Sequence, residues 1–185
     1  TKSSAVNGVN QISSTGKNIV PLAMDVTSES STKTKVEQII RQFKKIDVLV
    51  VSAGVFKPFG TFDSVSLEDS VEAIEINLIG TMRCVYYVIQ YMKRQKYGRV
   101  ILFSGGGVGG DIALVNASSY FTSKGAITVF AEVLALELAQ FNITVNAILP
   151  GQILTDLTKE LFDFSDKQLG PVLANAKQSL AKTGG

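Results

Sequence analysis

The sequence has no histidine, no tryptophan and only one cysteine among its 185 residues. Without histidine a Ser-His-Asp triad cannot form, and a lone cysteine leaves a structural zinc site without its usual ligands. The single thiol, Cys84, also excludes a disulfide within the chain. Because Cys84 lies in an apolar stretch typical of a helix, we expect a buried, unreactive thiol and no metal site.

Long apolar runs and concentrated charge are missing as well. No apolar stretch approaches the ~20 residues that a membrane-spanning helix requires. The polar start "TKSSAVNGVNQ" does not resemble a signal peptide. The net charge is only +2, and the basic residues are scattered rather than arranged in the stripe that nucleic acid needs. These features predict a cytoplasmic protein that binds neither membranes nor nucleic acid.

What is present is an alternation of apolar runs and helix-like repeats. Strands are expected over residues 18–26, 47–51, 99–103 and 143–149, helices over 27–46, 67–95 and 117–141, and loops and short helices after residue 151. Pro21 marks the first strand as an edge strand, and Gly98 is expected to end the second helix. The alternation predicts one α/β domain over residues 1–185, with helices on both faces of a doubly wound parallel sheet in three layers.

A run of glycines follows the third expected strand, with Gly105, Gly107 and Gly110 at the spacing G-x-G-x-x-G. A dinucleotide fingerprint requires a helix to begin at the third glycine and an acidic residue about 20 positions further on. Here a loop-like stretch follows, and Glu132, near that offset, lies inside an expected helix. We therefore interpret the run as a flexible turn that passes close to a ligand, and not as the phosphate-binding loop.

Tyr120 and Lys124 are four residues apart at the start of an expected helix, so their side chains share one face. An ammonium beside a phenol favours the phenolate and lowers the pKa of the tyrosine. Such a tyrosine can exchange a proton with an alcohol or a carbonyl. Ser104, at the end of the strand before the glycines, could hold the reacting oxygen. A Tyr-x-x-x-Lys pair alone is weak evidence, because it arises often by chance.

Taken together, five segments resemble the motifs of the short-chain dehydrogenase/reductase family, in the family's order. They are "PLAMDV", "IDVLVVSAGV", "EINLIGTM", "SSYFTSKGA" preceded by Ser104, and "NAILPGQILTDL", and they extend over residues 20–157. The resemblance implies a Rossmann-like fold and an oxidoreductase that uses NAD or NADP on a small-molecule alcohol or carbonyl substrate.

The resemblance also implies a role for individual residues. Tyr120 would be the general acid and base, Ser104 would position and polarise the substrate oxygen, and Asn77 would support a water in the proton relay. Lys124 would hold the ribose hydroxyls and lower the pKa of Tyr120. The residues expected to contact the cofactor are Asp25, Val26, Ser52, Ala53, Gly54, Tyr120, Lys124, Pro150, Gly151, Ile153 and Thr155.

The chain departs from the family pattern at two places in these motifs. Ser52 stands where the family usually has Asn. Ser104 lies 16 positions before Tyr120, a longer separation than is usual, and Gly105 stands where many members have a second Ser. A short insertion within the glycine run would explain the separation. Ser118 and Ser119 are the alternative candidates for the substrate-polarising residue.

The family's first strand, glycine-rich phosphate loop, first helix and second strand have no counterpart in the sequence, nor does its C-terminal end. We therefore expect the sequence to be part of a longer chain of about 250 residues. Leucines and phenylalanines at positions 157, 161, 162, 164 and 169 predict a lid over residues 154–180 and a partly apolar substrate. The long apolar helix over residues 117–141 suggests a homodimer or homotetramer.

Two other classes of function stay open at this point. One is a catalytically silent binding or scaffold protein on the same fold, since a fold alone does not determine function. The other is a methyltransferase with a related sheet, which would have no use for the Tyr-Lys pair.

Overall fold

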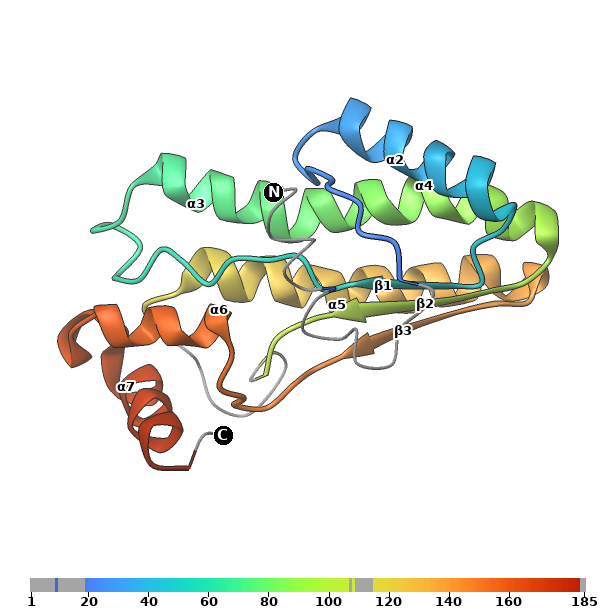
Figure 1. Cartoon of the computed structure of the whole chain (residues 1–185). Coiled ribbons are helices and arrows are strands. Elements are labelled where there is room, and N and C mark those ends of the chain that lie inside the picture. The colour runs from blue at the N-terminus through green and yellow to red at the C-terminus, as the bar shows by residue number, and fades with distance from the viewer. Residues whose placement is uncertain (1–8, 10–18, 107, 109–114, 184–185) are drawn as a thin grey trace.

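The computed structural model describes residue 9, residues 19–106, residue 108 and residues 115–183. Three parallel strands form its sheet: β1 (Val48–Val51), β2 (Gly98–Phe103) and β3 (Ile143–Ile148), with β2 in the middle. The register pairs Val51 with Leu102 in β1 and β2, and Phe103 with Ile148 in β2 and β3. The three strands therefore end at the same edge of the sheet, where their following loops meet (Figure 1).

The helices before and between the strands lie on the same side of this sheet (Figure 1). They are α2 (Glu29–Phe43), α3 (Leu67–Ile74), α4 (Gly80–Gln95) and α5 (Ser118–Leu138). The Ser28 hydroxyl caps α2 by accepting from the Ser31 N–H, and Ser66 caps α3 in the same way. Helix α4 ends at Gln95 as expected, but the left-handed residue that caps it is Lys96, at φ 52°, and not Gly98.

A π-helical turn, Glu75–Ile79, joins α3 to α4, so that the helix expected over residues 67–95 is one rod with a widened turn. A short 3₁₀ turn, Ala139–Phe141, extends α5 toward β3. Gly98 is the first residue of β2, and a side chain there would collide with Met92.

The main core lies between the sheet and these helices. Alternate strand residues point into it, such as Val100 and Leu102 of β2, and pack against Met92 of α4 and Ile127 of α5. On the other face of β1, Val48 and Val50 are about half exposed, at 52% and 53%. The described helices thus cover one face of the sheet, whereas the alternation of elements predicted helices on both faces.

The strand expected over residues 18–26 is not formed in the described part of this segment, residues 19–26. An extended segment becomes a strand only by pairing with a neighbour, and β1 pairs with β2 alone among the described strands. Val26 instead packs against α4 at Gly80, where an added Cβ would lie only 2.8 Å from a Val26 methyl carbon.

The C-terminal segment is more helical than the sequence predicted. It forms α6 (Asp156–Lys159), a 3₁₀ turn (Glu160–Asp163) and α7 (Asp166–Thr183), which is kinked where Gly170 has φ 73° before Pro171. Leucines of this segment build a second core with the loop after β1 and the start of α5; its members include Leu161, Leu169, Leu173, Leu180, Phe56, Phe59 and Ala117. This second core covers the carboxyl edge of the sheet.

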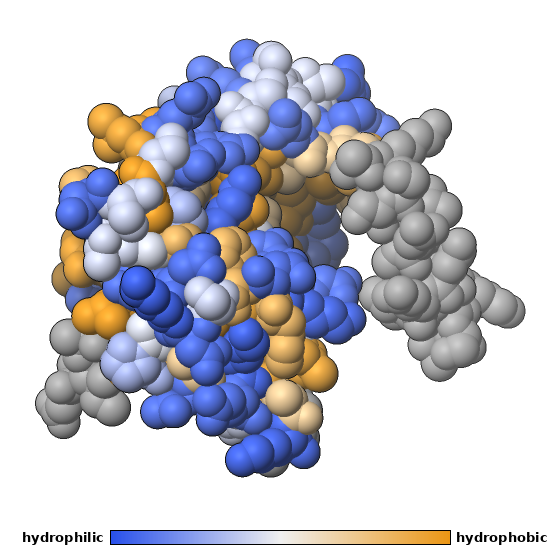
Figure 2. Space-filling model, turned by 90° about the vertical axis from the view of Figure 1, so that its left-hand side faces the viewer, coloured by the Kyte–Doolittle hydropathy of each residue, from blue (hydrophilic) through white to orange (hydrophobic). Residues whose placement is uncertain are grey.

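The surface is mixed in polarity. Figure 2 looks onto the left-hand end of Figure 1 and shows hydrophobic residues exposed among hydrophilic ones. Among the described helices, none is both long enough and apolar enough to cross a membrane.

Candidate active site

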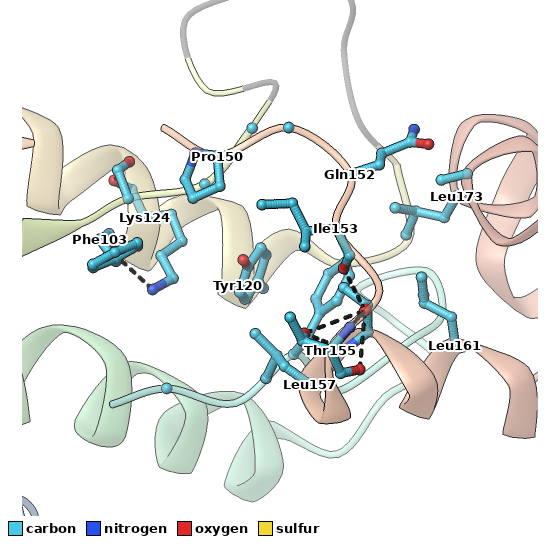
Figure 3. Close-up of a pocket in the computed structure, with 18 of the residues that line it drawn as sticks. Phe103, Tyr120, Lys124, Pro150, Gln152, Ile153, Thr155, Leu157, Leu161 and Leu173 are labelled. Carbon is cyan, nitrogen blue, oxygen red and sulfur yellow. Dashed lines mark hydrogen bonds between the residues drawn. The ribbon is translucent and has the colours of Figure 1, made fainter. Parts of the chain in front are cut away.

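A cavity of about 610 Å³ lies at the carboxyl edge of the sheet, beneath the C-terminal segment (Figure 3). Its size lies in the range of small-molecule sites. Each strand supplies wall residues from the loop that follows it: Ser52 and Gly54 after β1, residues 104–106 after β2, and Pro150 and Gly151 after β3. Helix α5 adds Tyr120 and Lys124. The structure therefore brings the three expected strand ends and the Tyr-Lys pair together.

Tyr120 is 9% exposed and lies among aromatic rings. Its ring centroid is 4.2 Å from that of Phe56 and 5.1 Å from that of Phe121. Burial raises the pKa of the Tyr120 phenol above its ordinary value. The structure gives the hydroxyl no hydrogen bond to any described residue. Tyr120 is therefore a neutral phenol at the wall of the cavity.

Lys124 lies one helical turn further along the same wall (Figure 3). Its ammonium donates to the Phe103 carbonyl at 2.9 Å and lies 5.7 Å from the centroid of the Tyr120 ring. Burial lowers the pKa of Lys124 to about 8. The expected lowering of the Tyr120 pKa by Lys124 is wrong for this structure, because burial of the phenol shifts that pKa upward and the ammonium is directed at the strand end.

Ser104 lines the cavity, but its hydroxyl is bound to α5. It donates to the Lys124 carbonyl at 2.7 Å and lies 2.8 Å from the Thr128 hydroxyl. Gly105 faces the Tyr-Lys pair instead: a Cβ there would lie 3.2 Å from Lys124 Cγ and 3.5 Å from Tyr120 Cε1. Ser104 thus fastens the end of β2 to α5, and position 105 is the one next to the two reactive side chains.

The alternative candidates for the substrate-polarising serine are not part of the cavity wall. Neither Ser118 nor Ser119 is among the residues that line the cavity. Much of the glycine run in which we expect an insertion, including Gly107 and Gly110, lies outside the described part of the chain.

Asn77 is fully buried in the π-helical turn. Its side-chain oxygen accepts from the Val55 N–H at 2.8 Å, and its side-chain nitrogen donates to the Val55 carbonyl at 3.0 Å and to the Ser123 hydroxyl at 3.2 Å. At Gly54, a Cβ would lie 3.1 Å from Asn77 Oδ1 and 3.5 Å from Lys124 Nζ. Asn77 therefore clamps the loop after β1 against α5, directly beside the lysine.

Most of the expected cofactor residues line the cavity, namely Ser52, Gly54, Tyr120, Lys124, Pro150, Gly151, Ile153 and Thr155. A Cβ at Gly151 would meet no atom within 4 Å, so the backbone there borders open space. Ala53, Asp25 and Val26 do not line the cavity. The Asp25 carboxylate accepts from the Thr27 N–H and hydroxyl at 2.9 and 2.7 Å, and these bonds lower the pKa of Asp25.

Sequence reasoning missed the residues that make the cavity wall apolar. Phe56 and Phe121 flank Tyr120, and Val172, Leu173, Ala176 and Leu180 of α7 line the roof. Leu169, Leu173, Ala176 and Leu180 follow the i, i+4, i+7 pattern of an amphipathic helix, which could have revealed α7. Of the expected lid residues, Leu157 and Leu161 line the cavity, whereas Phe162 is 41% exposed.

The described lining of the cavity carries one cationic side chain, and the described residues form no cluster of metal ligands. Lys124 is the one charged side chain among the described residues that line the cavity. Across the described part of the chain, no three His, Cys, Asp or Glu side chains gather as metal ligands would.

Comparison with known proteins decides the family. The family model of short chain dehydrogenases matches residues 1–166. The chain belongs to the short-chain dehydrogenase family. It is 35% identical over 161 residues to the short-chain reductase protein NovJ of Streptomyces niveus, covering 86% of this chain and 60% of that protein. It is 33% identical over 173 residues to the 3-oxoacyl-[acyl-carrier-protein] reductase FabG of Escherichia coli (strain K12), covering 91% and 67%.

Other relatives act on different compounds by name. The L-fucose dehydrogenase of Bos taurus is 34% identical over 140 residues, which cover 76% of this chain and 51% of that protein. The crystal structure of NAD+-bound xylitol dehydrogenase superposes with a TM-score of 0.80 at 30% identity, over 87% of this chain and 62% of the other. These likenesses establish a Rossmann-like α/β fold and a dehydrogenase or reductase family. The chain spans between about half and two thirds of the length of these relatives.

Proposed function

We propose that this chain forms the catalytic part of an oxidoreductase that transfers a hydride between NAD or NADP and an alcohol or carbonyl substrate. One observation carries the proposal. A neutral Tyr120 hydroxyl and a buried Lys124 ammonium lie one helical turn apart on the wall of a cavity at the carboxyl edge of a parallel sheet. Family membership supports it, because the named relatives are dehydrogenases and reductases, and one of them, a xylitol dehydrogenase, has NAD+ bound in its crystal structure.

The lining of the cavity supports a site for the nicotinamide end of a dinucleotide. Small or glycine residues border it after every strand, and the Gly151 backbone faces open space. Ser52, Gly54, Gly151, Ile153 and Thr155 would hold that end, and Asp25 and Val26 would meet the adenine end. When bound, the dinucleotide supplies or accepts the hydride, and the protein supplies orientation and proton handling.

Tyr120 handles the proton. In carbonyl reduction its hydroxyl donates a proton to the carbonyl oxygen as the adjacent carbon receives the hydride, and in alcohol oxidation the phenolate takes the proton back. Burial keeps the phenol protonated near neutral pH, which suits the donor role. Lys124 would bind the ribose hydroxyls; in this structure its ammonium is held at the Phe103 carbonyl, 5.7 Å from the centroid of the Tyr120 ring.

Ser104 and Asn77 are positioning residues that act through Tyr120 and Lys124. The Ser104 hydroxyl is bound to the Lys124 carbonyl and to Thr128, so its geometry supports positioning of α5 more than contact with the substrate oxygen. Asn77 holds the loop of Gly54 beside the Lys124 ammonium. A water relay at Asn77 stays a prediction.

Replacement of Tyr120 by Phe tests this assignment. The variant keeps the ring packing but loses the hydroxyl, so turnover should fall by about 100-fold or more, while the dinucleotide still binds. Oxidation of the reduced dinucleotide by a ketone, with calorimetry for binding, measures both. Tyr97→Phe, on the surface beside Arg99, is the matched control and should keep wild-type turnover.

Retained turnover in Tyr120→Phe would show that another group supplies the proton. Absence of turnover in the wild-type, full-length protein, whichever dinucleotide is offered, would favour a catalytically silent binding protein on the same fold.

A further inference from the structure

We propose that the substrate of this site is an uncharged alcohol or ketone whose body is hydrocarbon, and that sugars, polyols and anionic compounds are poor substrates. The proposal rests on the proposed function, because it places the reacting oxygen at Tyr120. It concerns what the rest of the cavity accepts once that oxygen is in place.

The apolar surface begins directly beside the reacting hydroxyl. The Phe56 ring centroid lies 4.2 Å from that of Tyr120, and Phe121 meets the Tyr120 ring edge-on at 5.1 Å. The roof above them comes from α6, the 3₁₀ turn and α7. Its members that line the cavity are Leu157, Leu161, Val172, Leu173, Ala176 and Leu180, with Thr158 as the exception.

The polar side chains of this part of the cavity are already engaged. The Thr158 hydroxyl donates to the Ile153 carbonyl at 2.8 Å and accepts from the Thr155 N–H at 2.8 Å. The Thr155 hydroxyl lies 3.3 Å from that of Thr158. Gln152 is exposed, and Figure 3 shows its amide directed away from Tyr120. A substrate bearing further hydroxyls would find few free partners here.

Lys177, a cation on the roof helix α7, is not among the residues that line the cavity. Lys177 of α7 donates to the Phe164 carbonyl at 2.7 Å and lies 3.6 Å from the Asp166 carboxylate. The Lys124 ammonium lies on the strand side, bound to the Phe103 carbonyl. No described cation therefore faces the apolar part of the cavity, and a phosphate or carboxylate on the substrate would be buried without a partner.

These observations set the expected selectivity. Each methylene that moves from water to an apolar wall raises kcat/KM by about 4-fold. Each substrate hydroxyl that loses water without gaining a partner lowers kcat/KM by about 10- to 100-fold. The kcat/KM of a polyol should therefore lie several orders of magnitude below that of a hydrocarbon ketone.

The test compares substrates on the full-length protein with either dinucleotide. Straight-chain methyl ketones from butanone to octanone should show kcat/KM rising with each methylene. The kcat/KM of octanone that carries a terminal hydroxyl should be about 10-fold or more below that of octanone itself. Xylitol and L-fucose, offered with the oxidised dinucleotide, should react slowest. Faster turnover of either polyhydroxy compound than of 2-octanol, or a flat ketone series, would overturn the proposal while leaving the proposed function intact.

A binding measurement separates the two claims. If neither class of compound is turned over, the proposed function fails, and calorimetric binding of 2-octanol against xylitol still decides the cavity's preference. Tighter binding of 2-octanol supports the apolar site, and equal or tighter binding of xylitol contradicts it.

A matched pair of valine variants tests whether the cavity roof causes the preference for hydrocarbon substrates. Val172 is half-buried in the cavity roof and Val71 is exposed on α3, away from the cavity. Val172→Thr places a hydroxyl on the wall without changing its shape, so kcat/KM for octanone should fall about 10-fold. Val71→Thr should leave it unchanged. Equal kinetics of Val172→Thr and wild type on octanone would contradict the assigned wall.

Discussion

Tyr120 and Lys124 show how burial shapes single residues of this site. Burial disfavours the charged form of each group, so it raises the pKa of the phenol and lowers that of the ammonium. The sequence predicted the pair and its shared helix face. It did not predict the direction of the tyrosine shift, because the aromatic neighbours Phe56 and Phe121 come from the fold and not from the motif.

The depressed pKa of Lys124 makes a prediction about stability. Below pH 8 the lysine is protonated both in the folded and in the unfolded chain. Between about pH 8 and pH 10.4 the folded chain has released the proton and the unfolded chain has not, so the unfolded state binds more protons and stability rises with pH. Relative to Lys124→Met, the wild type should therefore gain up to about 3 kcal/mol across this window.

Urea unfolding of both proteins at several pH values measures this difference. The other titrating groups, Cys84 and the remaining tyrosines among them, are present in both proteins and cancel in the comparison. A difference in unfolding free energy that does not vary between pH 7 and pH 10 would contradict a buried ammonium at this position.

At the scale of elements, the π-helical turn places Asn77 where a regular helix would not. The extra residue in the turn widens the rod between α3 and α4, and such turns often occur at functional sites. Asn77 then pairs with both backbone groups of Val55 and with Ser123. These partners come from a loop and a helix that are distant from Asn77 in sequence.

Asn77→Ala should destabilise the protein by about 1–3 kcal/mol, because it leaves the N–H and carbonyl of Val55 without their partner. The loop of Gly54 should loosen with it, and activity should fall. Urea unfolding measures the first effect. Asn175→Ala, on the exposed side of α7, is the control and should stay within about 0.5 kcal/mol of wild type. Equal stabilities of the two variants would show that the Asn77 clamp contributes nothing.

The helices and strands were largely predictable where the apolar pattern of the local sequence determines them. The three strands, α2, the long helix to residue 95 and α5 follow from their apolar patterns. The prediction of a strand over residues 18–26 was wrong. A strand forms only beside another strand, and the apolar pattern of a segment does not show whether such a partner is present. α7 was missed because Gly170 and Pro171 interrupt its sequence, although the chain continues as a helix after the kink.

At the scale of the whole molecule, the long helices leave apolar side chains uncovered. Val129, Val133 and Leu136 are spaced at i, i+4 and i+7 on α5, and Leu136 is 82% exposed. Met82 and Tyr86 are exposed one turn apart on α4. Contiguous apolar stripes of this kind mark protein interfaces. We infer that two copies of the chain associate through α4 and α5 as a homodimer, alone or within a homotetramer.

Leu136→Asp should therefore dissociate the assembly, because it buries a carboxylate in the apolar contact. Light scattering should give an assembled mass for the wild type and a monomer mass for the variant. Lys33→Asp, on the exposed surface of α2, changes charge without touching the stripe and should leave the mass unchanged. A monomeric wild type would contradict the inferred pairing.

The most direct test of the central claim follows the hydride itself. The full-length protein is given a ketone and a reduced dinucleotide that carries two deuterium atoms at nicotinamide C4, and the alcohol product is examined by mass spectrometry. Because we assign both hydride transfer and proton donation to this cavity, the wild type should place deuterium on the carbinol carbon, and Tyr120→Phe should form almost no alcohol. An unlabelled alcohol from the wild type, or equal labelled product from both proteins, would contradict it.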